Sequence, residues 1–215
     1  MKHIIDLESF ERKDSVLFFR SFLDPHISIT SEVECTGAKQ QAKEWGISFF
    51  LYYTHAMLKA ANEIKEFGYR FNAKGEVLYF DQLDALAIIR TGEQGKYNTL
   101  RLPYVEDLKA FAQKAASIID SHNSSSNPFG EESDSPEEDQ GVILISAIPT
   151  LSFTGISFAS HSPTEGYPLS LIGKLIVREG KEYIPIGLKV NHAFIDGYHL
   201  DNYYSRVSEL LVNLI

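Results

Sequence analysis

The sequence predicts an α/β fold, a two-layer sandwich in which a mixed β-sheet has its helices packed on one side. Helix-period and strand-period apolar patterns are interspersed along the chain, and the segment GVILIS at 141–146 is almost continuously apolar, as in a strand buried on both faces. Apolar residues make up 44% of the 215 residues, which is enough for one sizeable core. We therefore expect residues 1–215 to form a single domain.

The first part of the chain contains three helical patterns and one strand pattern. Residues 7–23 predict a helix that ends at an Asp-Pro pair, because proline disfavours a helical residue before it. Residues 27–36 alternate between apolar and polar, which predicts a strand with one buried face. A short helix is expected over 37–45, and a longer, largely buried one over 48–64.

The middle of the chain predicts strands, one clear helix and a loop. Residues 69–80 favour a hairpin about a Lys-Gly turn, and 84–91 favour another strand. Residues 105–120 carry apolar side chains on one helical stripe, the pattern of an amphipathic helix. Residues 121–140 are polar, acidic and poor in apolar side chains, so we expect an extended surface loop.

The last part of the chain supplies the remaining strands and a closing helix. After the buried strand at 141–146, further strands are predicted over 152–160, 168–177 and 183–190. Residues 198–215 have inward apolar positions at helical spacing and predict the last helix. These strands and helices together are the basis for predicting a mixed sheet with its helices packed on one side.

Composition limits the classes of function. A formal net charge of -9 argues against a surface for nucleic acid or anionic membranes, and no run is long and apolar enough for a membrane span. Cys35 is the one cysteine, so no intramolecular disulfide can form and no zinc-type cysteine spacing exists. We expect a cytoplasmic protein.

The stretch KVNHAFIDGYHL, residues 189–200, joins a strand pattern to a helix pattern. A strand that delivers His192 to its end would hold the imidazole at a fixed place on a rigid frame, where a general base is useful. The same letters fit ordinary structure, because Asp196-Gly197 is a common turn signal and a histidine is often only a satisfied polar residue. The string alone leaves both interpretations open.

Five segments, in order, resemble the chloramphenicol acetyltransferase family: FERKDSVLFFRSFL at 10–23, LRLPYVEDL at 100–108, LISAIPTLSF at 144–153, PLSLIGK at 168–174 and VNHAFIDGYH at 190–199. The last is similar to the family's His-His-Ala-x-x-Asp-Gly-aromatic-His. The resemblance implies the CoA-dependent acyltransferase fold and a homotrimer with active sites at the subunit interfaces. It also implies acetyl-CoA as co-substrate, no permanently bound cofactor or metal, and a small hydroxylated acceptor, in the first place chloramphenicol.

The resemblance assigns roles to individual residues. His192 would be the general base that takes the proton of the acceptor hydroxyl as it attacks the thioester. Ser146 would donate to the tetrahedral oxyanion, which is worth about 3 kcal/mol by analogy with other oxyanion holes. Asp196 would pair with Arg12 and fix the loop that carries His192, and Lys174 would lie near the coenzyme phosphates. Without the resemblance, Ser146 and Lys174 would be read as ordinary strand residues.

On the acceptor side the matched positions are Phe18, Phe19, Leu23, Tyr97, Thr99 and Phe129. Aromatic rings around a cleft would suit a nitrophenyl acceptor, and they would equally suit core packing.

The sequence departs from the family pattern at several positions near the expected site. Asn191 replaces the first histidine of the family pair, and Leu171 replaces a threonine near the reacting centre, which removes a hydroxyl. Phe19 stands where a tyrosine is common, Thr150 where a tryptophan often follows the proline, and Leu175 where an aromatic neighbours the matched lysine. The predicted base and serine are retained, so the sequence indicates acetyl transfer more firmly than it indicates the identity of the acceptor.

Other functions stay open at this point. The same chemistry on a different small hydroxylated acceptor is one, and a catalytically silent trimer that binds an aromatic ligand is another. The dihydrolipoyl acyltransferase core shares the His-x-x-x-Asp-Gly pattern but normally follows lipoyl and linker segments, which this sequence does not contain. Cys35 as an acyl-accepting nucleophile is a further alternative, although no basic residue adjoins it in sequence.

Overall fold

A computed structural model describes residues 1–72, 74–90, 96–122, 141–159 and 166–213. Among these residues, seven strands form the main sheet. Its order across the sheet is β2 (His26–Glu34), β10 (Lys181–Asn191), β8 (Leu169–Ile172), β7 (Val142–Ala147), β5 (Asp84–Arg90) and β6 (Tyr97–Leu102), and β9 (Ile176–Arg178) also pairs with β10. The β5–β7 and β7–β8 pairs are parallel and the others antiparallel, so the sheet is mixed, as predicted.

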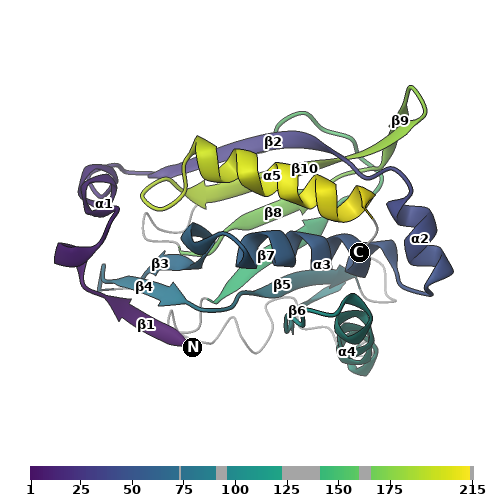
Figure 1. Ribbon diagram of the computed structural model, residues 1–215, viewed down its shortest axis with the longest axis horizontal. Coiled ribbons are helices and arrows are strands. Elements are labelled where there is room, and N and C mark those ends of the chain that lie inside the picture. The colour runs from purple at the N-terminus through teal and green to yellow at the C-terminus, as the bar shows by residue number, and fades with distance from the viewer. Residues whose placement is uncertain (73, 91–95, 123–140, 160–165, 214–215) are drawn as a thin grey trace.

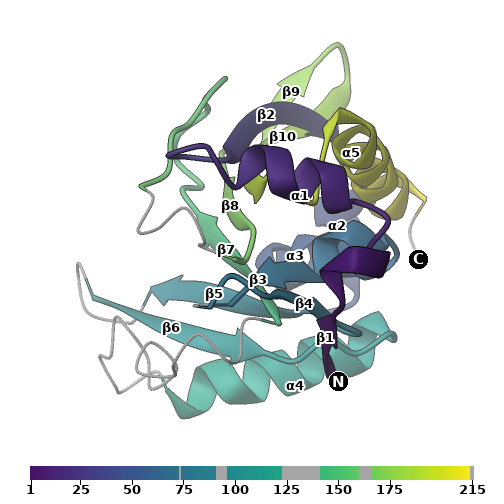
Figure 2. The same ribbon diagram turned by 90° about the vertical axis from the view of Figure 1, so that its left-hand side faces the viewer.

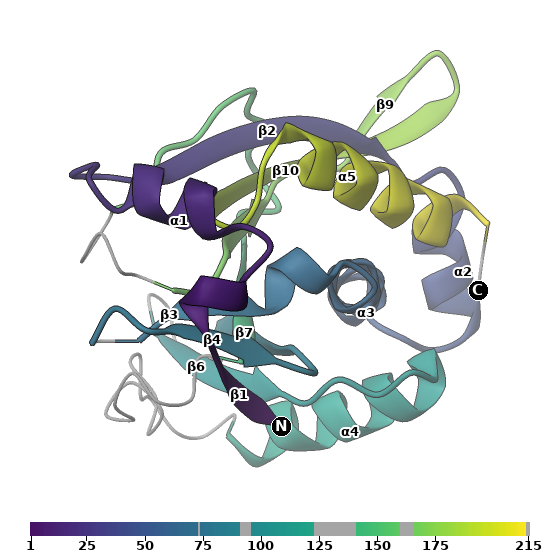
Figure 3. The ribbon, with the colours of Figure 1, turned by 60° about the vertical axis from the view of Figure 1, so that its left-hand side comes forward.

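The helices pack on one face of this sheet (Figure 1). The long ones are α3 (Phe49–Asn62), α4 (Leu108–Ser121) and α5 (Gly197–Val212), and α2 (Ala38–Glu44) is short. Figure 3 shows α3 end-on, between α5 and α4. The prediction of a two-layer sandwich with helices on one side is therefore confirmed. Within the part of the chain that the structure describes, no helix is long and apolar enough to cross a membrane.

Strand alternation gives the main sheet two different faces. Ile145 of β7 and Ile186 of β10 belong to the buried core beneath the helices. Their neighbours Ser146 and Gly187 therefore point to the opposite face, which we call the helix-free face. There a Cβ on Gly187 would approach Ile156 to 2.8 Å, so the segment after β7 covers part of this face.

A second, three-stranded sheet has the order β1 (Lys2–Ile5), β4 (Val77–Phe80) and β3 (Tyr69–Phe71). Buried Arg70 joins the two sheets, because its guanidinium donates to the carbonyls of Phe67 and Tyr69 and, in the main sheet, of Val142. Figure 2 shows this sheet below α1 (Lys13–Phe19). The predicted hairpin over 69–80 is present, with Gly75 at a φ of 76° in its turn.

The first helix differs from the prediction over 7–23. The described structure has a 3₁₀ turn at Leu7–Ser9, then Phe10 in an extended conformation, and only then α1, which ends at Phe19. Phe10 is extended because its ring is buried, 4.8 Å from the Tyr69 ring. Core burial of one aromatic side chain thus outweighs the helical pattern around it.

Two further predictions about strands are wrong. Residues 152–159 contain no strand, and the predicted strand over 168–177 is divided into β8 and β9 at Gly173. A Cβ on Gly173 would lie 2.6 Å from the Pro185 ring and 2.8 Å from the Leu151 carbonyl, so the chain is crowded where it leaves the sheet. The sequence patterns also missed β1 and β6, and the predicted loop over 121–140 falls almost entirely outside the described residues.

Candidate active site

His192 lies immediately after β10, at the end of the molecule where β10 runs into α5 and where α1 also lies (Figure 1). Its backbone N–H donates to the Pro25 carbonyl over 2.8 Å, and its Nδ1 lies 3.0 Å from the Ile195 carbonyl oxygen. A carbonyl can only accept, so Nδ1 carries the proton in this hydrogen bond. In the neutral ring, Nε2 is then the nitrogen that can accept a proton.

An aromatic cluster borders the His192 imidazole. The Phe19 ring is stacked on it, with centroids 4.5 Å apart and planes 26° apart. The Phe18 and Phe22 rings follow at 5.1 and 5.3 Å from Phe19, and Phe18 is 61% exposed. Leu23 is 95% exposed. Three of the predicted acceptor-binding residues, Phe18, Phe19 and Leu23, thus lie on the His192 side, with much apolar surface uncovered.

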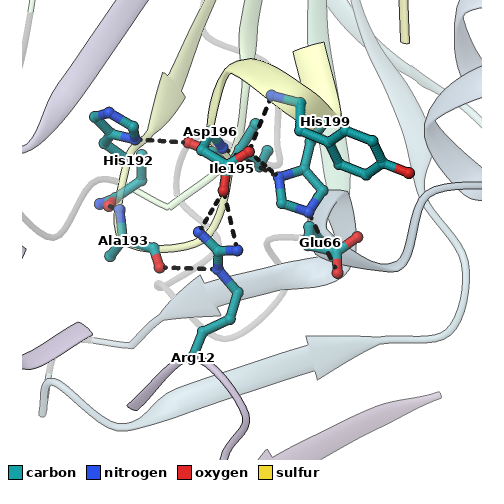
Figure 4. Close-up of polar contacts among 9 residues, drawn as sticks. Arg12, Glu66, His192, Ala193, Ile195, Asp196 and His199 are labelled. Atoms are coloured by element: carbon teal, nitrogen blue, oxygen red, sulfur yellow. Dashed lines mark hydrogen bonds and ion pairs between the residues drawn. The ribbon is translucent and has the colours of Figure 1, made fainter. Parts of the chain in front are cut away.

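The loop between His192 and α5 is held by Arg12. Its Nη1 and Nη2 each lie 3.2 Å from Asp196 Oδ2, and its Nε donates to the Ala193 carbonyl over 3.4 Å (Figure 4). Asp196 is also the N-cap of α5, since its side chain accepts from the Tyr198 backbone N–H at 3.0 Å. The structure therefore brings together the Arg12 and Asp196 side chains that the resemblance paired.

Sequence reasoning missed His199, which completes this network. Its imidazole forms a capping box with Asp196, and its Nε2 lies 3.5 Å from Glu66 Oε1 (Figure 4). A capping box is normally read from Glu or Gln three residues after the cap, so the only signal for His199 was its match to the last histidine of the family motif. Burial alone would raise the pKa of Asp196, but the His199 charge and the Arg12 hydrogen bond and charge outweigh it and lower that pKa.

Ser146 lies elsewhere, in a row of side chains on the helix-free face. Strand pairing places Ser146 beside Leu171, and Leu171 beside Gly187. On the other side, Ile88 pairs with Thr99, and the Ala87–Ile145 pair brings Ile88 next to Ser146. Thr99, Ile88, Ser146 and Leu171 thus form one row across the sheet, with Ile88 between Thr99 and Ser146.

The same register separates Ser146 from His192 within one chain. Gly187, in the Ser146 row, precedes His192 by five residues along β10, and two strand spacings separate β10 from β7. At about 3.4 Å per residue and 4.8 Å per strand, the two residues lie roughly 20 Å apart. One copy of the chain therefore does not bring the predicted base and the predicted oxyanion donor together.

The remaining predicted residues fall on the Ser146 side or outside the described residues. Tyr97 lies two residues from Thr99 on β6, and exposed Lys174 follows β8. Thr150 is exposed in the turn after β7, and Leu175 packs against the core. Phe129 lies within 123–140, outside the described residues.

Asn191, which replaces a family histidine, is 5% exposed. Its Oδ1 accepts from the Ala193 N–H over 3.0 Å, and its Nδ2 has no hydrogen-bond partner among the described residues. The side chain thus helps to shape the turn that begins at His192.

Cys35 does not have the surroundings of a nucleophile. Burial, with Glu182 and Glu34 nearby, raises the pKa of its thiol to about 12, so the reactive thiolate is scarce at neutral pH. In the described part of the chain, no cluster of three His, Cys, Asp or Glu could hold a metal ion.

Comparisons with known proteins show which family has this fold and sequence. A chloramphenicol acetyltransferase family model matches residues 2–208. A chloramphenicol acetyltransferase from Staphylococcus aureus is 27% identical, covering 96% of this chain and 94% of that protein, and one from Clostridium perfringens is 24% identical, covering 98% and 95%. A solved structure described as chloramphenicol acetyltransferase is 46% identical, with a TM-score of 0.94 over 98% of this chain and 100% of that one.

More distant structures share the fold alone. The dihydrolipoamide acetyltransferase of Azotobacter vinelandii is 15% identical, with a TM-score of 0.64 over 94% of this chain and 86% of that one. The family model and the full-length relatives agree over nearly the whole sequence. The chain belongs to the chloramphenicol acetyltransferase family and is an acyltransferase.

Proposed function

We propose that the protein transfers the acetyl group of acetyl-CoA to a hydroxyl group of chloramphenicol, with His192 as general base. The observation that carries this proposal is the hydrogen bond between His192 Nδ1 and the Ile195 carbonyl. It assigns the ring proton to Nδ1 and leaves Nε2 as the proton acceptor, as base catalysis near neutral pH requires. Family membership supports acetyl-CoA as the donor and chloramphenicol as the acceptor.

In the proposed reaction, His192 Nε2 takes the acceptor's hydroxyl proton while the hydroxyl oxygen attacks the thioester carbonyl carbon. The carbonyl oxygen becomes an oxyanion, to which the Ser146 hydroxyl donates a hydrogen bond. The C–S bond then breaks as the carbonyl reforms. The thiolate leaves with the proton from the imidazolium, which restores neutral His192 and releases CoA and the acetyl ester. The thiolate is a good leaving group, so no acyl-enzyme is needed.

The active site is proposed to form between copies of the chain in a homotrimer. His192 of one copy would face Ser146 of another, since roughly 20 Å separates the two residues within one chain. Phe18 and Leu23, which precede and follow Phe19 in the chain, are 61% and 95% exposed, which is apolar surface that a partner would cover. Closed rotational symmetry would then repeat the same shared site at each interface.

The acceptor would be held from both sides of this interface. Phe19 stacks on His192 and would place an aromatic wall beside the base. Tyr97 and Thr99 point to the same face as Ser146, so they would border the acceptor from the partner. Lys174 is exposed at the end of β8, on the Ser146 side, where a cation would meet the coenzyme phosphates.

The test is release of the free thiol from acetyl-CoA with chloramphenicol as acceptor. The parent protein should release thiol, and His192→Ala should be slower by at least about a hundredfold, as expected for loss of a general base. The matched control is His122→Ala, since His122 is the exposed C-cap residue that follows α4. An inactive parent would contradict the proposal, and so would an active His192→Ala variant.

A second candidate is the same reaction on a different small hydroxylated compound. The observation in its favour is that Leu171, an apolar residue, lies beside Ser146 on the helix-free face, where the acceptor would bind. A panel of alcohols in the same assay decides between the two. Faster thiol release with another alcohol than with chloramphenicol would favour the second candidate, whereas ligand binding with no thiol release for any alcohol would point to a silent binding protein.

A further inference from the structure

His199 is buried in the first turn of α5, between two carboxylates. The residue is 8% exposed. Its Nδ1 lies 2.8 Å from Asp196 Oδ1 and 3.2 Å from the Asp196 backbone nitrogen, and its Nε2 lies 3.5 Å from Glu66 Oε1. Figure 4 shows the imidazole bridging these two groups. It therefore ties the loop before α5 to the 3₁₀ turn at Lys65–Gly68.

A continuous set of contacts leads from His199 to His192. The carbonyl that accepts from His192 Nδ1 belongs to Ile195, and the next residue is Asp196, whose side chain His199 contacts. Arg12 holds the same carboxylate from the other side. A shift of Asp196 would therefore move the Ile195 carbonyl, and with it the ring that this carbonyl orients.

An imidazole suits this position better than a glutamate, one of the usual capping-box residues, would. A glutamate there would add a third carboxylate beside Asp196 and Glu66, and like charges so close repel. The other charged group in the network is Arg12, on the far side of Asp196. The Tyr198 ring packs edge-on against the imidazole with centroids 5.6 Å apart, so the ring is also held by packing.

We propose that His199 is a positioning residue for acyl transfer: by bridging Asp196 and Glu66 it holds the Ile195 carbonyl where it orients His192. This inference rests on the proposed function of His192 as the base. His199 touches neither the acceptor nor the acetyl donor in this arrangement. It acts through the loop, which it shares with Arg12.

Steady-state kinetics of His199→Ala separate positioning from binding. Misplacing a catalytic group by about 1 Å can cost on the order of a hundredfold, so kcat should fall about tenfold to a hundredfold. KM for acetyl-CoA and for the acceptor should stay within about twofold, because neither substrate contacts His199. The matched control is His3→Ala, since His3 also bonds a carboxylate, that of Asp81, but in the small sheet.

Two further variants keep the test valid if His199→Ala folds poorly. His199→Gln keeps a polar side chain at the capping-box position, with an amide that can donate to a carboxylate, and should recover part of kcat. Glu66→Gln should lower kcat in the parent but add little in the His199→Ala background, because the two side chains act through one contact. Unchanged kcat in His199→Ala, or fully additive effects, would overturn the inference.

The ¹⁵N shifts of the His192 ring provide a readout that does not depend on the acceptor. In the parent they should report a proton on Nδ1, and in His199→Ala a mixture of the two tautomers. Identical His192 spectra in both proteins would overturn the inference even if thiol release failed with chloramphenicol. A parent that is inactive but shows the expected spectral change would instead contradict the proposed function and leave the role of His199 in orienting His192 standing.

Discussion

Asp196 has two separable structural roles, and two substitutions distinguish them. Asp196→Asn keeps an oxygen that can cap α5 but removes the charge that faces Arg12, whereas Asp196→Ala removes both. Loss of an N-cap costs about 1 kcal/mol, and the partly exposed ion pair contributes little more. In urea unfolding at pH 7, Asp196→Ala should therefore be the less stable variant by about 1 kcal/mol. Equal stability of the two would contradict this account of the cap.

The same pair of proteins tests the charge on Asp196. Because the pKa of Asp196 is lowered in the folded chain, its carboxylate stabilises the fold fully above the unfolded-state pKa of about 4, and that contribution is lost as pH falls through the folded-state pKa. Asp196→Asn does not titrate there. The difference in unfolding free energy between parent and Asp196→Asn should therefore shrink below about pH 4. A difference that stays constant from about pH 7 to 3 would show that the charge contributes nothing.

At the scale of the elements, sequence patterns worked best where one periodic face is buried. The amphipathic pattern over 105–120 corresponds to α4, and the alternation over 27–36 corresponds to β2. Residues 152–159 alternate too, yet they form no strand, because pairing depends on a neighbouring strand that local pattern does not encode. Strand β6 was missed for the converse reason: its polar residues, such as Arg101, obscured the alternation.

The candidate site shows the same limit. The resemblance pointed to Arg12, Asp196 and His192, and the fold brings these three to one loop. The resemblance also gave Ser146 a role in the same reaction and placed the active sites at subunit interfaces, and sheet register puts Ser146 far from His192 within one chain. Register and assembly are long-range properties, so one sequence could predict the groups but not which copy supplies each of them.

Gly173 tests the division of the predicted strand into β8 and β9. In Gly173→Ala the new Cβ would lie 2.6 Å from the Pro185 ring and 2.8 Å from the Leu151 carbonyl oxygen, so the chain must shift. We expect a loss of about 1–3 kcal/mol in unfolding free energy, as for other overpacked sites. The control is Gly155→Ala, where nothing lies within 4 Å of the added carbon. Equal stability of the two variants would contradict this explanation of the break at Gly173.

At the scale of the whole molecule, the single chain presents what we propose to be two halves of a shared site. One half holds His192, the proposed base, together with the stacked Phe19 and the loop carbonyl that bonds its ring. The other half is the row on the helix-free face that contains Ser146. Exposed Phe18 and Leu23 leave the first half uncovered, which is unfavourable for an isolated subunit in water. Assembly of several copies would complete the site and, at the same time, bury this apolar surface.

The most direct test of shared sites mixes two inactive variants. His192→Ala and Ser146→Ala each lack one half of the proposed site. Random reassembly into trimers should restore about a quarter of the parental sites, because each mixed trimer has one interface at which both residues are intact. We therefore predict that thiol release by the mixture, after joint unfolding and refolding, rises to about a quarter of the parental rate, while each variant treated alone stays near background. A mixture no more active than the two variants separately would contradict the claim that His192 and Ser146 act together from different copies.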